Sequence, residues 1–346
     1  MNCLKPTLTG CLLLLAMGGW FLYPQTASKS FLEAFDGPTV DTARWQVATW
    51  MEHNGQTGTA RCFVSDGCLN LVLRNEDGRI LSAALQTWGR FLFGKWEARL
   101  KCASQAGVLN SFYTIDWDND QTPEPADGSK QEVDLELLTR SFGPGSGQAH
   151  LAVHEAGQTS WDTAPDLDLG FNPSAAFHTW SVEITSTFIR WSVDGRVLHT
   201  YRYAGHPIAI TRPYQLKLNT WTGGSWVGGP PPSGVDCVYQ VDWIRFTEYP
   251  AGEPPLELTA PAGGEVWRLG QERAITWQSS GVESPLVLEL LSGETLLGEI
   301  AHGVPVASGS WLWQVGTLAD GRRVSCPDLK IRIRTPDGKT ADQRKL

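Results

Sequence analysis

Residues 131–138 read Gln-Glu-Val-Asp-Leu-Glu-Leu-Leu, so acidic and apolar side chains alternate. Side chains alternate between the two faces of a β-strand, and this stretch therefore predicts a strand with Glu132, Asp134 and Glu136 on one face. The apolar residues between them then point into a core. Three carboxylates on one face repel each other. A solvated strand face would normally mix in Thr, Lys or Ser, so the pattern favours a functional site over a plain surface.

Carboxyl groups in this arrangement suit glycoside hydrolysis. That reaction typically needs one ionised carboxylate and one protonated carboxyl on either side of the bond. A third acid between the two raises the proton affinity of its neighbours. On a strand the α-carbons of Glu132 and Glu136 are about 13 Å apart, at ~3.3 Å per residue, whereas the carboxyl groups of a retaining enzyme lie about 5–5.5 Å apart. The two side chains must therefore lean together over a concave sheet.

The rest of the chain indicates an all-β protein. Its 346 residues suit two domains, and alternating apolar runs between turn signals recur from residue 31 to about 248. One of them is a hairpin around Asp194-Gly195. The 16 Trp fit β-sandwich cores as well as platforms for sugar rings. A net charge of −9 argues against a nucleic-acid partner, because such proteins carry a basic face.

Residues 1–28 predict an export signal, in which Lys5 precedes an apolar run and small residues follow near Ala27. The run is shorter than the ~20 residues needed to cross a bilayer, and no other segment is long enough, so we expect no integral membrane domain. An uncleaved anchor is an alternative. We therefore expect a secreted or extracellular protein, with the periplasm and the cell wall as other locations. Cys62 and Cys68 flank a turn, and one hypothesis is that they form a disulfide.

A Pro-rich stretch, residues 250–256, reads as a stiff linker. Residues 257–346 then give a second series of five or six strands, of the size of an immunoglobulin-like sandwich. The polar end, residues 337–346, is expected to be frayed. The predicted organisation is a signal (1–28), a first domain (29–249), the linker and a C-terminal module.

Beyond the alternation, Glu132-x-Asp134-x-Glu136 resembles the signature of glycoside hydrolase family 16, which contains lichenases, laminarinases and xyloglucan transglycosylases. The resemblance extends in order over residues 31–248 and includes the segments 35–37, 93–101, 107–114, 177–182, 191–197 and 241–246. It implies a concanavalin-like β-jelly-roll with a concave carbohydrate cleft. It also implies that Glu132 is the nucleophile, Glu136 the general acid/base and Asp134 the assisting acid of a retaining enzyme.

The resemblance also suggests residues that contact the substrate. By position they are Asn54, Phe112, His154, Asn219, Trp221 and Trp226, with Tyr113 as an alternative to Phe112. The stretch 82–87 lacks the Glu and Arg that lichenases carry there, and Lys130-Gln131 replaces Trp-Asp before the motif. The exact glucan is therefore left open. No His or Cys spacing predicts a metal site and no cofactor is expected, although some family members hold a structural calcium.

The segment 256–336 resembles a module found in yeast cell-wall glucan-assembly proteins and on exported bacterial enzymes, described as Ser-Thr-rich and membrane-anchored. This resemblance implies a spacer or polysaccharide-binding sandwich. Our first hypothesis is a secreted, monomeric, retaining endo-β-glycosidase whose partner is a polysaccharide of the β-1,3/1,4-glucan type. The second is a transglycosylase that remodels β-glucan, xyloglucan or chitin-type chains. The third is an inactive glucan-binding wall protein, against which the intact acid triplet argues.

Overall fold

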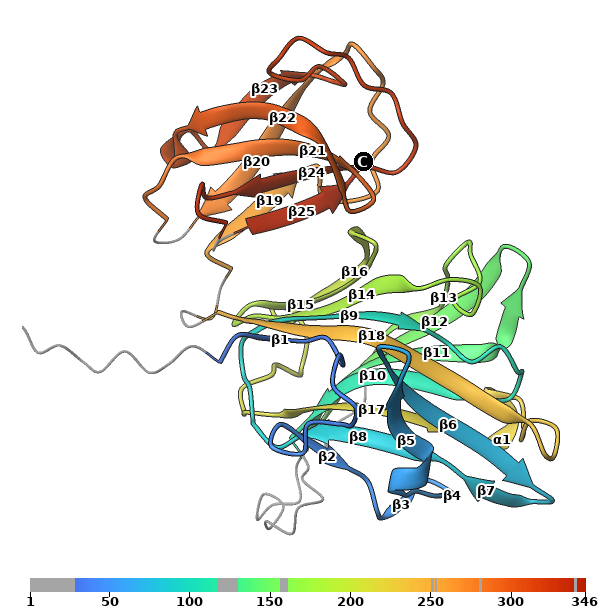
Figure 1. Ribbon diagram of the computed structural model, residues 1–346. Helices are drawn as coiled ribbons and strands as arrows, with labels where there is room; N and C mark the ends of the chain where they lie inside the picture. Colours follow the sequence, from blue (N-terminus) through green and yellow to red (C-terminus); the bar gives the residue numbers. More distant parts are fainter. Residues whose placement is uncertain are drawn as a thin grey trace, which may run out of the picture.

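The computed structural model describes residues 29–116, 130–155, 161–249, 252, 254–279, 282–338 and 341–346, and only the backbone of residues 161–165. The predicted export signal lies outside these ranges, as do residues 250, 251 and 253 of the predicted linker. The described chain is almost entirely β-structure (Figure 1). Its helices are single turns: α1 (Gly224–Val227), η1 (Thr59–Arg61) and η2 (Val306–Ser308). None of these described helices has the length or the apolar character to cross a membrane.

Two sheets form the first part of the chain. The larger, which we call the outer sheet, has eleven described strands, with the order β16 (Arg196–Arg202), β15 (Phe188–Val193), β14 (His178–Ile184), β9 (Gly94–Lys101), β18 (Asp236–Glu248), β6 (Cys68–Glu76), β7 (Arg79–Leu81), β4 (Gly55–Gln56) and β3 (Met51–Glu52), while β1 (Phe31–Glu33) pairs with β18 and β5 (Cys62–Ser65) with β6. The other, which we call the inner sheet, has seven, in the order β13 (Trp161–Asp168), β12 (Ser146–Glu155), β11 (Gln131–Gly143), β10 (Leu109–Ile115), β17 (Gln215–Trp221), β8 (Ala83–Thr87) and β2 (Trp45–Val47).

Alternation along the strands builds the core between these two sheets. Val133, Leu135 and Leu137 of β11 are fully buried and point toward the outer sheet, from which Trp96 and Trp180 enter the same cluster. The acidic residues between them must then lie on the opposite face of the inner sheet. We call this opposite face the acid face.

The tight hairpins follow the turn chemistry of the sequence. Asp194-Gly195 joins β15 to β16, and both residues have positive φ, as a type I′ turn requires. The turn at residues 66–67 joins β5 to β6 in the same way. The structure does not support the disulfide hypothesis, because Cys62 and Cys68 are both free. Cys62 pairs across the hairpin with Leu71, whereas Cys68 pairs with Ser65, three residues from Cys62. An odd spacing along a strand places the side chains of Cys62 and Cys68 on opposite faces.

The C-terminal part has two further sheets and a core of its own. One sheet has the order β19 (Leu256–Ala260), β20 (Glu272–Ser279) and β23 (Ser310–Gln314), and the other β22 (Thr295–Val304), β21 (Leu286–Ser292), β24 (Leu329–Arg334) and β25 (Ala341–Lys345). The expectation of a frayed end was wrong, because β25 pairs along β24 and buries Arg344. The guanidinium of Arg344 pairs with Asp342 on the same strand.

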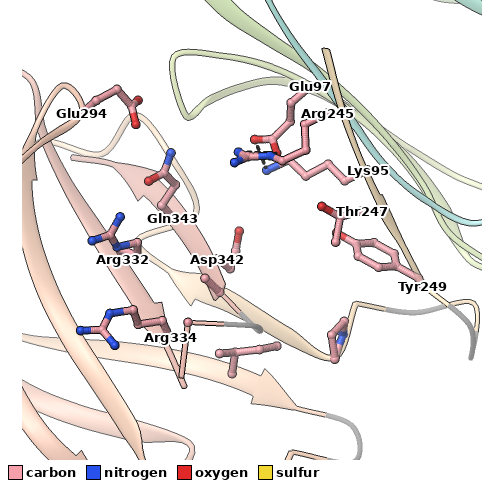
Figure 2. A pocket seen from close by; sticks show the side chains of 14 residues that line it. Lys95, Glu97, Arg245, Thr247, Tyr249, Glu294, Arg332, Arg334, Asp342 and Gln343 are labelled. Atoms are coloured by element: carbon pink, nitrogen blue, oxygen red, sulfur yellow. Dashed lines mark hydrogen bonds and ion pairs between the residues drawn. The ribbon is translucent and has the colours of Figure 1, made fainter. Parts of the chain in front are cut away.

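The C-terminal part contacts the outer sheet, on the side away from the acid face (Figure 1). Arg190 of β15 joins the two parts, since its guanidinium lies 2.7 Å from Glu183 of β14 and 2.6 Å from Glu257 of β19. The backbone N–H of Lys345 donates to the carbonyl of Gly195, in the turn between β15 and β16. A crevice of about 490 Å³ remains beside these contacts. Figure 2 shows its charged lining, with side chains such as Lys95 and Arg245 on one wall and Arg332 and Arg334 on the other.

Candidate active site

The predicted acid row lies on one face of β11. Glu132 and Glu136 are partly exposed and Asp134 is 6% exposed, whereas the three apolar residues between and after them are completely buried. Strand β12 runs antiparallel beside β11 and pairs Glu132 with His154 and Asp134 with Ala152. The small side chain of Ala152 leaves room above Asp134. His154 fills this room, and its Nε2 lies 3.0 Å from Asp134 Oδ2.

The two glutamates have different electrostatic surroundings. Glu132 Oε2 accepts a hydrogen bond from Lys130 Nζ at 2.8 Å, and this ion pair suits a carboxylate. Burial raises the pKa of Glu136 well above its usual value, and the negative charges of Asp134 and Glu132 raise it further, while His154 lowers it. One glutamate is therefore paired with a cation, and the other has a pKa well above its usual value. This difference is what an acid and a nucleophile that act on one bond require.

Lateral to the acid row, Asn219 of β17 is the centre of a buried polar cluster. Ser111 Oγ donates to Asn219 Oδ1. Asn219 Nδ2 donates to Glu52 Oε1 at 2.7 Å and lies 3.5 Å from the hydroxyl of Tyr113. The indole N–H of Trp50 donates to the other oxygen of Glu52 at 3.0 Å. The cluster thus adds a fourth carboxylate to the face that carries the acid row.

An aromatic group lies at the end of β17. Trp221 stacks on His53 with ring centroids 4.0 Å apart, and Trp226 lies 6.2 Å from Trp221. His150, the cross-strand partner of Glu136, meets the ring of Trp226 edge-on at 5.2 Å. Asn54 lies close to the Gly223 turn that follows Trp221, since a Cβ on Gly223 would be 3.6 Å from its Nδ2. Flat rings beside hydrogen-bonding groups are a common arrangement for binding sugars.

The structure corrects one predicted contact. Phe112 is completely buried in the core between the sheets, so it does not line the acid face. Its neighbour Tyr113 lies on that face, because side chains alternate along β10. The roles of Asn54, His154, Asn219, Trp221 and Trp226 as substrate contacts stay predictions, although all five lie near the acid row or the aromatic group.

Sequence reasoning missed Trp50, Glu52 and His53. They reach the acid face from a short hairpin at the edge of the outer sheet, β3–β4, which carries no clear strand pattern. The available signal was the run of acid, His and Asn at 52–54, three consecutive polar side chains after Trp50-Met51. Among the described residues, no group of three or more His, Cys, Asp or Glu is arranged to hold a metal ion.

Comparisons with known proteins show which family the sequence matches. The model of the family described as "Glycosyl hydrolases family 16" matches residues 46–245, which include the acid row. A beta-glucanase of Bacillus subtilis is 28% identical over 268 residues, which cover 70% of this chain and 99% of that protein. A beta-glucanase of Fibrobacter succinogenes is 31% identical over 176 residues, which cover 49% of this chain and 48% of that protein.

Solved structures share the fold. The beta-glucanase of Bacillus licheniformis superposes with a TM-score of 0.53 at 22% identity and covers 65% of this chain and 100% of its own. The laminarinase catalytic domain of Thermotoga maritima gives a TM-score of 0.53 at 20% identity, with 63% and 97% coverage. These likenesses confirm the predicted jelly-roll sandwich.

Proposed function

Since the chain belongs to glycosyl hydrolase family 16, and is therefore a glycoside hydrolase, we propose that it is an exported endo-β-glucanase that cleaves β-1,3/1,4-glucan-type polysaccharide with retention of configuration. The observation that carries the proposal is the unequal pair on β11. Burial and two neighbouring negative charges raise the pKa of Glu136, whereas Glu132 lies in an ion pair with Lys130.

On this proposal Glu136 donates its proton to the glycosidic oxygen while the carboxylate of Glu132 attacks the anomeric carbon. The aglycone leaves, and a covalent glycosyl–enzyme remains on Glu132. Water then attacks the same carbon, the bond from that carbon to Glu132 breaks, and the Glu132 carboxylate is released. Glu136 takes the proton of that water, so both groups are ready for the next cycle. Asp134 assists throughout, since its negative charge raises the pKa of Glu136.

The substrate class is supported by the names of the curated relatives, which are beta-glucanases. The aromatic group of Trp221 and Trp226 supports a carbohydrate ligand in general. We further propose that residues 1–28 direct export. The C-terminal part, residues 257–346, is proposed to be an immunoglobulin-like module that acts as a spacer or binds polysaccharide.

Product analysis tests the proposal. The purified chain is incubated with barley β-glucan, laminarin, xyloglucan and chitin-type oligomers, and we expect shorter β-glucan fragments whose first-formed anomer is β by NMR. Glu132→Gln should abolish the activity and leave the circular dichroism spectrum unchanged. Glu76→Gln, on the outer sheet, is the matched control and should retain full activity. Products larger than the input would identify a transglycosylase instead, and an active Glu132→Gln variant would overturn the mechanism.

A further inference from the structure

Glu52 is placed unusually for a residue of a two-residue edge strand. Met51 beside it is 60% exposed, but Glu52 turns inward and is only 9% exposed. Its two oxygens accept hydrogen bonds from Asn219 and Trp50. Each carboxylate oxygen can accept two hydrogen bonds, so these contacts use half of its capacity. Burying a carboxylate is costly, and two neutral donors compensate only part of that cost.

The register of the inner sheet shows why Glu52 has room. Asn219 on β17 pairs directly with Ala84 on β8. A larger side chain at position 84 would lie next to Asn219 on the acid face, but the methyl group of Ala84 leaves this place unfilled by β8. The carboxylate of Glu52, which comes from another segment, lies within hydrogen-bond distance of the same Asn219 side chain.

This carboxylate lies near the acid row but does not belong to it. Strand β17 is separated from β11 by β10, which corresponds to about 10 Å at ~4.8 Å per strand. Tyr113 of β10 connects the two places. Its hydroxyl lies 3.5 Å from Asn219 Nδ2. Burial raises the pKa of Tyr113, and the negative charges of Glu52, Glu132, Asp134 and Glu136 raise it further. A glycan that crosses the strands would therefore reach Glu52 with a unit other than the one that reacts.

We propose that Glu52 is a specificity-determining residue whose carboxylate binds two neighbouring hydroxyls of a sugar unit held between Asn219 and the stacked rings of His53 and Trp221. The proposal rests on the proposed function and deepens it. The rings of His53 and Trp221 stack with centroids 4.0 Å apart and supply a flat surface, and the carboxylate supplies acceptors beside it. Equatorial vicinal diols, as in glucans, match the two oxygens of one carboxylate.

Kinetics on substrates of two lengths test the proposal. Wild type, Glu52→Ala and Glu52→Ala/Ala84→Glu are compared on a β-glucan oligosaccharide long enough to cross β11, β10 and β17 and on an aryl β-glucoside with a single sugar unit. Loss of a charged hydrogen-bond partner predicts a fall of about 10- to 100-fold in kcat/KM on the long substrate, mainly through KM. The fall on the short substrate should be at least tenfold smaller. The double variant, which supplies a carboxylate from β8, should recover part of the loss.

The alternative is that Glu52 only anchors the hairpin. Trp50→Phe removes the indole N–H that binds Glu52 but keeps the carboxylate, so it is the control for anchoring. Equal losses on both substrates, no loss on either, or a Trp50→Phe variant that reproduces Glu52→Ala would overturn the proposal. The proposed function is tested separately, because it is contradicted if the wild type cleaves no β-glucan. The role of Glu52 can then still be read from a titration that compares oligosaccharide binding to wild type and to the Glu52 variants.

Discussion

Asp134 and His154 shift the pKa of Glu136 in opposite directions. The negative charge of Asp134 raises the pKa of Glu136, and the charge of His154 lowers it. On the proposed mechanism catalysis requires protonated Glu136, so the alkaline limb of the kcat/KM profile should follow this pKa. We expect Asp134→Asn to move that limb to lower pH and His154→Gln to move it to higher pH, as measured from kcat/KM on soluble β-glucan across the full pH profile.

Asp166 provides the internal control for this pair. Its negative charge also raises the pKa of Glu136, but by less than that of Asp134. Asp166→Asn should therefore shift the limb in the same direction as Asp134→Asn and by a smaller amount. Shifts of the same sign for Asp134→Asn and His154→Gln would show that Glu136 does not set the limb.

At the residue scale, the acid row could be predicted because its members lie two apart on one strand, where the alternation of side chains fixes a common face. Phe112 and Tyr113 could not be separated in this way. Both are aromatic neighbours on β10, and only the register against β11 and β17 determines which one faces the core. Glu52 was missed because its place depends on how an edge hairpin folds over a distant strand.

At the scale of elements, the glycine at the start of β9 allows this strand to pack closely against β18. A Cβ on Gly94 would lie 2.5 Å from the ring of Phe246 and from the carbonyl of Thr247. Gly94→Ala should therefore overpack the core and lower the free energy of unfolding by about 1–3 kcal/mol in urea denaturation followed by Trp fluorescence. Gly58→Ala is the matched control, because a Cβ there meets nothing within 4 Å and the backbone is extended. Equal stability of the two variants would contradict this packing argument.

The strands could be predicted where apolar and polar residues alternate in the sequence, and the hairpins where a turn contains Asp-Gly, as at Asp194-Gly195. The short strands β3 and β4 and the last strand β25 could not. β25 is polar, and its position depends on Arg344, whose guanidinium is compensated by acids of its own strand and of β19. A buried charge with one of its partners on a strand far away in the sequence leaves no periodic signal.

At the scale of the whole molecule, Arg190 links the two parts of the chain and sets an acid limit to their stability. Burial would raise the pKa of Glu183, but the charges of Arg190, Lys95 and Arg344 outweigh burial and lower it to about 2. A lowered pKa contributes stability that is present above the unfolded-state pKa and lost as the pH falls toward 2. The shift from 4.5 corresponds to about 3 kcal/mol.

Arg190→Met tests this linkage. It leaves Glu183 buried without its main partner, so we expect a loss of about 3–5 kcal/mol near neutral pH. The difference from wild type should narrow on acidification, because protonated Glu183 no longer needs a cation. Thermal melts at several pH values measure both effects. Arg322→Met, at an exposed pair with Asp320, is the control and should change stability by less than about 0.5 kcal/mol. A constant difference across pH would refute the role of Glu183.

Arg190→Met should also release the C-terminal part, because it removes the ion pair with Glu257 of β19. Small-angle scattering should then show a larger radius of gyration than wild type, and proteolysis within residues 250–256 should become faster. Unchanged scattering and unchanged cleavage would mean that the remaining contacts, such as the backbone bond from Lys345 to Gly195, are enough to hold the two parts together.

The side of the jelly roll on which the C-terminal part lies has a consequence for tethered action. That part contacts the outer sheet, and the acid face looks the opposite way (Figure 1). A chain immobilised through its C-terminal part would turn the acid face away from the support. On the proposed function, it would then cleave polysaccharide molecules in the surrounding medium and not the material to which it is attached. Attachment and cleavage would therefore involve different polysaccharide molecules.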